Sequence, residues 1–209
     1  MEIEEYIAQH IDEEGEYLHR LYRATQTQLL YGRMASGHVQ GRLLKMFVEM
    51  IRPTNILEIG TYSGYSALCM AEGLQAGGMV HTIEIFDELE DFTRPWIENS
   101  PWADRVKFYI GDAMEIVPQM NLKFDMAFID GNKREYVNYY EMVIQHMNHG
   151  GFILADNTLW DGHVFEQPAE HDEQTKGIMA FNDFVAKDER VEKVIVPVRD
   201  GISIIKMKN

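Results

Sequence analysis

Two pairs of chemically active side chains each follow a short apolar run. Asp130 and Lys133 come after the run FDMAFI, and Asp156 and Asn157 come after the run GFILA. If both runs are strands, their carboxyl ends bring three oxygen donors together. An all-oxygen set favours a hard divalent cation over zinc, with Mg²⁺ first and Ca²⁺ or Mn²⁺ as alternatives. Without an obvious arginine partner, the two carboxylates would need a cation to offset their repulsion. The alternative is that each aspartate caps the helix that follows it.

Lys133 lies three residues after Asp130, close enough for both side chains to face one pocket. Beside a cation and partly removed from water, its amine can take a proton from a hydroxyl group and make that oxygen nucleophilic. The cation would also fix the direction of the hydroxyl. The alternative is a solvated lysine that follows a strand and has no chemical role.

A glycine-containing turn, LEIGTYSGYS, forms a second candidate site at residues 57–66. Gly60 and Gly64 allow the backbone to approach a ligand closely and to adopt positive φ. Tyr62 stands where a dinucleotide fingerprint has its second glycine, which argues against NAD. Ser66 and the amides that begin the next helix could instead receive a carboxylate. The alternative is an ordinary turn between a strand and a helix.

Acidic residues also end the next two predicted strands. Glu84, 24 residues after Gly60, could accept both hydrogen bonds of a ribose diol, or it could be a solvated charge. Asp112 could accept a hydrogen bond from the amino group of adenine, or it could cap the following helix. Because ligands of open α/β sheets bind outside the carboxyl ends of the strands, these features together indicate a nucleoside site.

Short apolar runs alternate with longer amphipathic segments, which indicates a parallel sheet with helices on both faces. The predicted strands cover residues 55–60, 79–85, 106–112, 124–130 and 151–156, and the predicted helices cover 64–76, 87–98, 112–120, 134–148 and 175–187. Two further runs, VEKVIVPV and ISIIKMK, are separated only by Arg199, Asp200 and Gly201. No crossover helix fits between them, so they must pair antiparallel.

Helices are predicted before the first strand. Residues 1 to about 30 mix polar and apolar residues at helical spacing. The segment 38–51 places five apolar residues on one helical face: Val39, Leu43, Met46, Phe47 and Met50. We expect a single domain over residues 1–209, with a helical extension at 1–37 and a core at 38–209, because no repeat or flexible linker interrupts the chain.

The composition narrows the classes of partner and compartment. With 209 residues, of which 45% are hydrophobic, the chain can bury one core. Its formal net charge of -15 disfavours nucleic acid, because phosphate binding depends on lysine and arginine. Cys69 is the only cysteine, the acidic first residues do not resemble a signal peptide, and no apolar run is long enough to span a bilayer. We therefore expect a cytoplasmic protein without membrane contact.

Three segments resemble the cation-dependent O-methyltransferases, a family that includes the catechol and caffeoyl-CoA enzymes. They are LEIGTYSGYS, FDMAFIDGNKREYVNYYE and GGFILADNTLWDGHV, and the resemblance extends over about Met34 to Asn209. It implies a Rossmann-like class I methyltransferase fold, with a seven-stranded, mostly parallel sheet that ends in an antiparallel hairpin. It also implies S-adenosylmethionine as the methyl donor and a homodimer, which is usual in the family.

The resemblance also implies a role for each matching residue. The metal would be bound by Asp130, Asp156 and Asn157, and Lys133 would be the base. S-adenosylmethionine would be held by Met34, Ser36, Glu58, Gly60, Tyr62, Ser63, Gly64, Ser66, Glu84, Ile85, Asp112, Ala113 and Asp130.

The acceptor site should differ from that of the catechol enzyme, which has aromatic residues where this chain has Gly131 and Asn132. The substrate would contact Asn132, and Trp160 would form one wall of its pocket or, alternatively, anchor a loop. The favoured acceptor is a small catechol-like or other vicinal hydroxy aromatic molecule, because two neighbouring oxygens can chelate one metal.

One alternative function is methylation of hydroxyuridine in transfer RNA, which the negative charge opposes. The other is an S-adenosylmethionine-binding module without catalysis, which the intact lysine and metal positions oppose.

Overall fold

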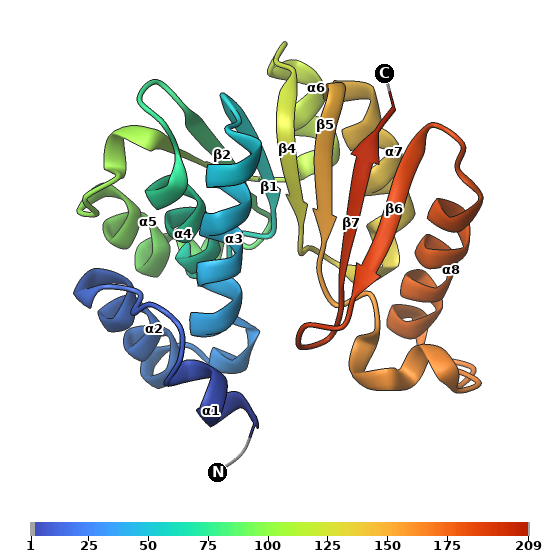
Figure 1. The fold of residues 1–209 in the computed structure, drawn as a ribbon, viewed down its shortest axis with the longest axis horizontal. Helices are drawn as coiled ribbons and strands as arrows, with labels where there is room; N and C mark the ends of the chain where they lie inside the picture. Colours follow the sequence, from blue (N-terminus) through green and yellow to red (C-terminus); the bar gives the residue numbers. More distant parts are fainter. Residues whose placement is uncertain (1–2, 209) are drawn as a thin grey trace.

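The computed structural model describes residues 3–208 and contains a seven-stranded sheet with the order β3-β2-β1-β4-β5-β7-β6 (Figure 1). The strands are β1 (Asn55–Ile59), β2 (Met79–Glu84), β3 (Val106–Ile110), β4 (Phe124–Ile129), β5 (Met147–Ala155), β6 (Val191–Val196) and β7 (Ile202–Met207). Residues 1, 2 and 209, which the predicted single domain includes, lie outside the described range.

Strands β1 to β5 pair parallel with one another, whereas β7 pairs antiparallel with both β5 and β6. The connection between β6 and β7 is too short for a crossover helix, so the chain reverses in a turn. The predicted α/β class is therefore confirmed: the sheet has seven strands, is mostly parallel and ends in an antiparallel hairpin.

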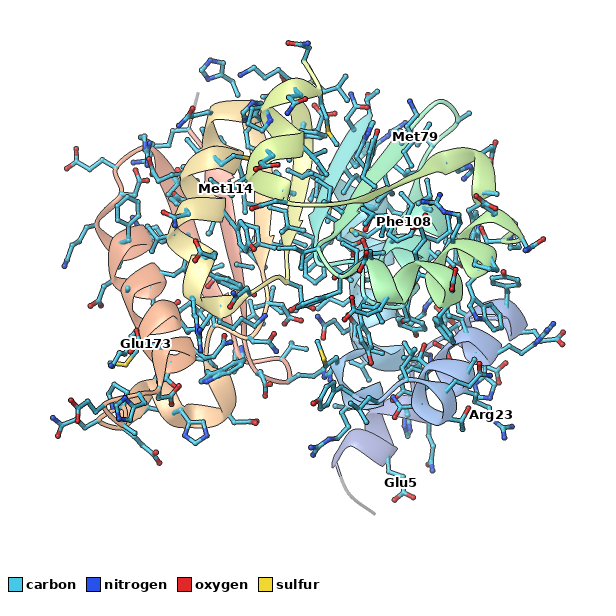
Figure 2. The ribbon with its side chains drawn as sticks, turned by 180° about the vertical axis from the view of Figure 1, so that it is seen from behind. Glu5, Arg23, Met79, Phe108, Met114 and Glu173 are labelled. Carbon is cyan, nitrogen blue, oxygen red and sulfur yellow. The ribbon has the colours of Figure 1, made fainter. Side chains whose placement is uncertain are left out.

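Helices cover both faces of this sheet. The α-helices are α1 (Ile3–Ala8), α2 (Glu16–Gln28), α3 (Gly37–Ile51), α4 (Tyr65–Gly73), α5 (Glu90–Glu98), α6 (Ala113–Gln119), α7 (Tyr136–His146) and α8 (Glu173–Lys187). Short 3-10 helices are η1 (Gly32–Met34), η2 (Asp87–Leu89), η3 (Ala103–Arg105), η4 (Lys133–Glu135) and η5 (Trp160–Phe165). Neighbouring side chains of β1 alternate between the two faces. Ile56 packs in the cluster with α2 to α5, and Leu57 packs in the cluster with α6 to α8. Figure 2 shows the layers from behind, with Phe108 on β3 and Met114 on α6.

The carboxyl ends of the parallel strands meet at one edge of the sheet, the lower edge in Figure 1. The turn between β6 and β7 lies at the same edge, as do α1 and the segment around η5. This arrangement brings the N-terminal residues, the strand-end residues and the C-terminal hairpin into one region, where ligands of open α/β sheets bind.

The apolar face predicted for this helix is only partly buried in α3, because Leu43 and Phe47 pack against the core but the two methionines do not. The residues that α3 buries include Gln40, Gly41, Leu44 and Val48, whereas Met46 and Met50 are 56% and 64% exposed. A Cβ atom at Gly41 would lie 2.8 Å from Cys69 Sγ, so this glycine allows α3 to approach α4 closely. The close contact turns a glycine and a glutamine inward, which a search for apolar periodicity does not detect.

The predicted boundary between the helix at 134–148 and the strand at 151–156 is wrong. Helix α7 ends at His146 and β5 begins at once with Met147, which pairs with Phe124 ahead of an irregularity in the register. The strand therefore starts before Gly150 and Gly151 rather than at the second of them. No helix in the described part of the chain is long and apolar enough to cross a membrane.

The orientation of α3 predicts that truncation of Leu44 lowers the free energy of unfolding much more than truncation of Met46. Leu44→Ala should lower the free energy of unfolding by about 2–5 kcal/mol, because it leaves a cavity against α4. Met46→Ala removes a similar volume from the exposed side and should cost about 0.5 kcal/mol or less. Urea unfolding of both variants measures the difference. Equal losses would contradict the orientation of the helix.

Candidate active site

The turn after β1 is fixed against its neighbours by close backbone contacts. Gly60 has φ 101°, and a Cβ atom there would lie 2.3 Å from the carbonyl oxygen of Asp130. The backbone amide of Tyr62 donates to Glu84 Oε2 at 2.7 Å. Gly64, with φ 82°, begins the turn into α4. The predicted cofactor turn therefore lies directly between the ends of β2 and β4.

Glu84 is buried at the end of β2, so its interpretation as a solvated charge is wrong. Its second oxygen, Oε1, accepts from the amide of Phe86 at 3.0 Å. Burial raises the pKa of Glu84 above its ordinary value, while these amides oppose the shift. Each carboxylate oxygen keeps a further lone pair for a ligand. The contact with a ribose diol stays a prediction.

Glu58 lies beneath the cofactor turn and is fully buried. Thr82 donates to its Oε2 at 2.5 Å, and Oε1 has no hydrogen-bond partner among the described residues. Burial raises the pKa of Glu58 to about 8, although Ser66 and Thr82 oppose the rise. Thr82 also shares a hydrogen bond with Thr61 of the cofactor turn, which connects Glu58 to that turn, and direct contact of Glu58 with the donor stays a prediction.

The next strand end carries Asp112 and Ala113. The Asp112 Oδ1 atom accepts from the amide of Met114 at 2.8 Å, so this residue caps α6. Its other oxygen has no such partner in that cap, and contact with adenine stays a prediction. Ala113 is buried, whereas Ile85, just after β2, is 54% exposed at the same edge of the sheet. An apolar side chain next to this strand end can cover one face of a planar ring.

Lys133 is brought to Asp130 by the 3-10 helix η4. Its Nζ atom lies 2.7 Å from Asp130 Oδ1 and 2.6 Å from the hydroxyl of Tyr136. Tyr136 is fully buried, and burial raises the pKa of its phenol well above the ordinary value, so the hydroxyl stays protonated. That hydroxyl can donate to the carbonyl oxygen of Asp156 at 3.0 Å or of Ile129 at 3.2 Å. The lysine is thus held in place between the ends of β4 and β5.

Asp156 is 3% exposed and lies at the end of β5. Gln40 donates to its Oδ2 at 2.6 Å, and the amide of Asn157 donates to its Oδ1 at 2.8 Å. Burial and the neighbouring Asp130 carboxylate raise the pKa of Asp156 to about 6, against the opposing effects of Gln40 and Lys133. The two carboxylates therefore repel each other, but Asp130 has a cationic partner in Lys133 that the sequence interpretation missed.

The donor chemistry at these strand ends suits a hard cation. Within residues 3–208 no group of three or more His, Cys, Asp or Glu side chains converges on one point. The predicted set has two carboxylates and an amide instead. The Asn157 Nδ2 atom donates to Asp200 Oδ2 at 3.3 Å, which leaves its amide oxygen as an acceptor. Asp130, Asp156 and Asn157 can offer only oxygens as ligands, and the buried Asp156 lies near the partly exposed Asp130 carboxylate, a donor set that fits Mg²⁺ or Ca²⁺.

The remaining predicted residues lie around this centre. Asn132 accepts from the amide of Arg134 at 3.3 Å and begins η4. Trp160 is half-buried and packs against the cluster that contains α7 and α8, which agrees with an anchor for its loop. Met34 is exposed on η1, and Ser36 is buried, with its carbonyl oxygen hydrogen-bonded to Arg199.

Backbone strain concentrates in this region. Seven described residues other than glycine have positive φ. Five of them lie in the segments that connect strands at the carboxyl edge of the sheet: Tyr62, Asn157, Trp160, Asp161 and Arg199. Such conformations cost free energy and persist where the surrounding structure requires them, which is common at functional sites.

Sequence reasoning missed Tyr136, Gln40 and Arg199. Tyr136 had a detectable signal, because it follows Lys133 at the same three-residue spacing by which Lys133 follows Asp130. Gln40 contacts Asp156 across 116 residues, and no local pattern marks that contact.

A family model, related sequences and a solved structure all match most of this chain. Residues 8–208 match the family model described as O-methyltransferase. Tricin synthase 2 of Oryza sativa subsp. japonica is 34% identical over 202 residues, which cover 91% of this chain and 69% of that protein. A caffeoyl-CoA O-methyltransferase of Stellaria longipes is 28% identical and covers 91% of this chain and 83% of that protein. The O-methyltransferase TomG of Streptomyces achromogenes, solved in complex with SAM, superimposes with a TM-score of 0.89 at 25% identity, covering 98% of this chain and 95% of that chain.

The buried Glu58 predicts a pH-dependent effect on stability. Its folded-state pKa of about 8 lies above that of an unfolded glutamate, so its stabilising contribution is complete at low pH and is lost as the pH rises toward 8. Glu58→Gln removes this loss while keeping the shape of the side chain. The stability of the variant relative to the wild type should increase by more than about 1 kcal/mol between pH 5 and pH 8. Urea unfolding at the two pH values measures it, and a difference that does not change with pH would refute the prediction.

Proposed function

The chain belongs to the O-methyltransferase family, and we propose that it transfers the methyl group of S-adenosylmethionine to a hydroxyl oxygen of a small vicinal hydroxy aromatic molecule with the help of a divalent cation. The observation that carries the proposal is the contact between Lys133 Nζ and Asp130 Oδ1 at 2.7 Å, next to the buried Asp156 carboxylate. An amine held in this way can remove a proton from an acceptor that lies against the donor turn.

S-adenosylmethionine is proposed as the donor because of the family and because the similar TomG structure was solved with it. The features of the donor site lie at successive strand ends. The turn around Ser66 would receive the amino acid part, Glu84 the ribose and Asp112 the adenine. Since Gly60 contacts the carbonyl of Asp130, a donor on the turn lies next to the acceptor region.

A divalent cation is proposed because of the oxygen donors at the ends of β4 and β5. Asp130, Asp156 and Asn157 would hold it. When bound, such a cation lowers the proton affinity of a coordinated hydroxyl and fixes its orientation. Two adjacent hydroxyls on one ring are suited to this arrangement, since both oxygens can reach the same cation.

The residues of the chain supply the rest of the mechanism. Lys133 Nζ takes the proton of the acceptor hydroxyl, while Tyr136 keeps the amine in position. A lone pair of that oxygen forms a bond to the methyl carbon, and the bond between carbon and sulfur breaks with its electron pair left on sulfur. The products are the methyl ether and S-adenosylhomocysteine, and the proton leaves Lys133 for solvent. Most of the rate derives from the alignment of oxygen, carbon and sulfur.

The acceptor is proposed to be a small molecule rather than RNA, because the net charge of -15 opposes phosphate binding. The relatives named for caffeoyl-CoA and tricin synthesis also support an aromatic acceptor. Asn132 and Trp160 would line its pocket. The exposed Met34 and Ile85 would cover parts of the two substrates that extend beyond the sheet.

An assay with labelled methyl donor tests the substrate class and the cation together. We expect methyl transfer to one or more catechols or to a catechol-bearing coenzyme A ester, and a loss of at least about 100-fold when EDTA removes divalent metal, with recovery on addition of Mg²⁺. Hydroxyuridine-containing RNA is the comparison acceptor. Transfer to that RNA alone would reject the small-molecule proposal, and full activity in EDTA would reject the role of the cation.

The role of Lys133 is tested by substitution. Lys133→Ala should lower kcat by about 10²–10⁴-fold, because the general base is lost. Binding of S-adenosylhomocysteine, measured by calorimetry, should change less than about twofold. Lys123→Ala is the matched control, since Lys123 is an exposed lysine just before β4, at the opposite end of the same strand. Normal turnover in Lys133→Ala would remove this residue from the mechanism.

A further inference from the structure

Helix α3 buries a polar side chain on its inner face. Gln40 is 1% exposed, whereas the apolar Met46 and Met50 of the same helix face solvent. A buried carboxamide lowers stability unless its donor and acceptor atoms are both hydrogen-bonded. Both are bonded here: Nε2 donates to Asp156 Oδ2 at 2.6 Å, and Oε1 accepts from Arg199 Nη1 at 2.9 Å. The inward position of Gln40 is therefore explained by its two partners.

Arg199 adopts a backbone conformation that favours glycine. It lies in the turn between β6 and β7 and has φ 49°, in the left-handed region that a side chain makes unfavourable. The same Nη1 atom that contacts Gln40 also contacts the carbonyl oxygen of Ser36, and it lies 3.4 Å from that of Ala35. The strained position thus places one guanidinium group against the N-terminal segment and α3 at once.

We propose that Gln40 and Arg199 are positioning residues, which together fix the orientation of the Asp156 carboxylate and hold segment 35–36 against the site. The proposal rests on the function proposed above, in which Asp156 takes part in the reacting centre. It assigns a functional role to two residues outside the predicted site, from two segments that are far from β5 in sequence.

The geometry explains how the orientation is fixed. Asp156 accepts one hydrogen bond on each oxygen, from Gln40 and from the amide of Asn157. These two donors define the plane of the carboxylate, and each oxygen keeps lone pairs for the site. Without Gln40 the carboxylate can rotate and lose its bond to Asn157. Arg199 acts through Gln40, because its bond to Oε1 keeps the amide nitrogen turned toward Asp156.

Gln40→Met tests the first residue with a side chain of similar volume. We expect kcat to fall by about 10–100-fold, as for other partners that orient a functional ligand, while the KM for S-adenosylmethionine changes less than about threefold. The amide of Asn157 should exchange with deuterium at least about tenfold faster, measured residue by residue by NMR, since its acceptor has moved. Met50→Leu, on the exposed side of α3, is the control and should change none of these quantities.

Arg199→Gly tests the second residue without adding strain, because glycine adopts the left-handed conformation freely. Exchange at the amide of Ala35, which donates to the carbonyl oxygen of Gly32, should become faster, and kcat should fall by about tenfold. In the Gln40→Met background, Arg199→Gly should lower kcat less than about threefold further, because its effect passes through Gln40. If the losses of kcat in the two single variants multiply in the double variant, Arg199 does not act through Gln40 and this part of the proposal is overturned.

The hydrogen-exchange measurements distinguish failure of the proposed function from failure of the positioning role. If the wild-type chain methylates no acceptor, the proposed function fails, but the Asn157 and Ala35 amides still report whether the two residues hold their partners. Faster exchange confined to those amides supports the positioning role. Unchanged exchange at Asn157 in Gln40→Met overturns it, and so does a general rise along α3 and β5, which would indicate a purely structural effect.

Discussion

The repulsion between Asp130 and Asp156 is the constraint on which the rest of the site depends. Parallel pairing of Ile129 with Ala155 places the residues that follow, both aspartates, side by side at the edge of the sheet. Specific partners reduce the repulsion: Lys133 forms an ion pair with Asp130, and Gln40 and the amide of Asn157 donate hydrogen bonds to Asp156. Burial first, and the Asp130 carboxylate second, still raise the pKa of Asp156 to about 6, so its charged form is less favourable than that of an exposed aspartate. A divalent cation would reduce the repulsion further.

The donor site is mechanically connected to this charged centre. Gly60 packs on the carbonyl of Asp130, and the Tyr62 amide is bound by Glu84. The turn after β1 is therefore held by the ends of β2 and β4, so a donor bound there, as proposed, would have a fixed distance from Lys133. In the proposed mechanism, these rigid elements would supply the alignment of donor and acceptor on which methyl transfer chiefly depends. Residues with positive φ lie at the same edge, next to the proposed acceptor site.

The sequence predicted the sheet well because each strand is a compact apolar run, and because a three-residue gap before the last strand leaves only an antiparallel pairing. It also predicted which residues lie at the strand ends, since topology brings those ends to one edge. It could not predict the side-chain contacts between segments that are far apart in the sequence. The inward face of α3 depends on Gly41 meeting Cys69 and on Gln40 meeting Asp156, contacts that no periodicity contains. The ion pair of Asp130 with Lys133 could not be predicted for a different reason: a three-residue spacing allows both side chains to face one pocket but does not distinguish an ion pair from a base beside a metal ligand.

The most direct measurement is an anomalous difference map from crystals grown with Mn²⁺ and S-adenosylhomocysteine. The account predicts a peak within about 2.6 Å of an oxygen of each of Asp130, Asp156 and Asn157, beside the sulfur of the bound nucleoside. A map with the nucleoside in place and no peak between these three side chains would contradict it, because the two carboxylates would then tolerate each other without a cation.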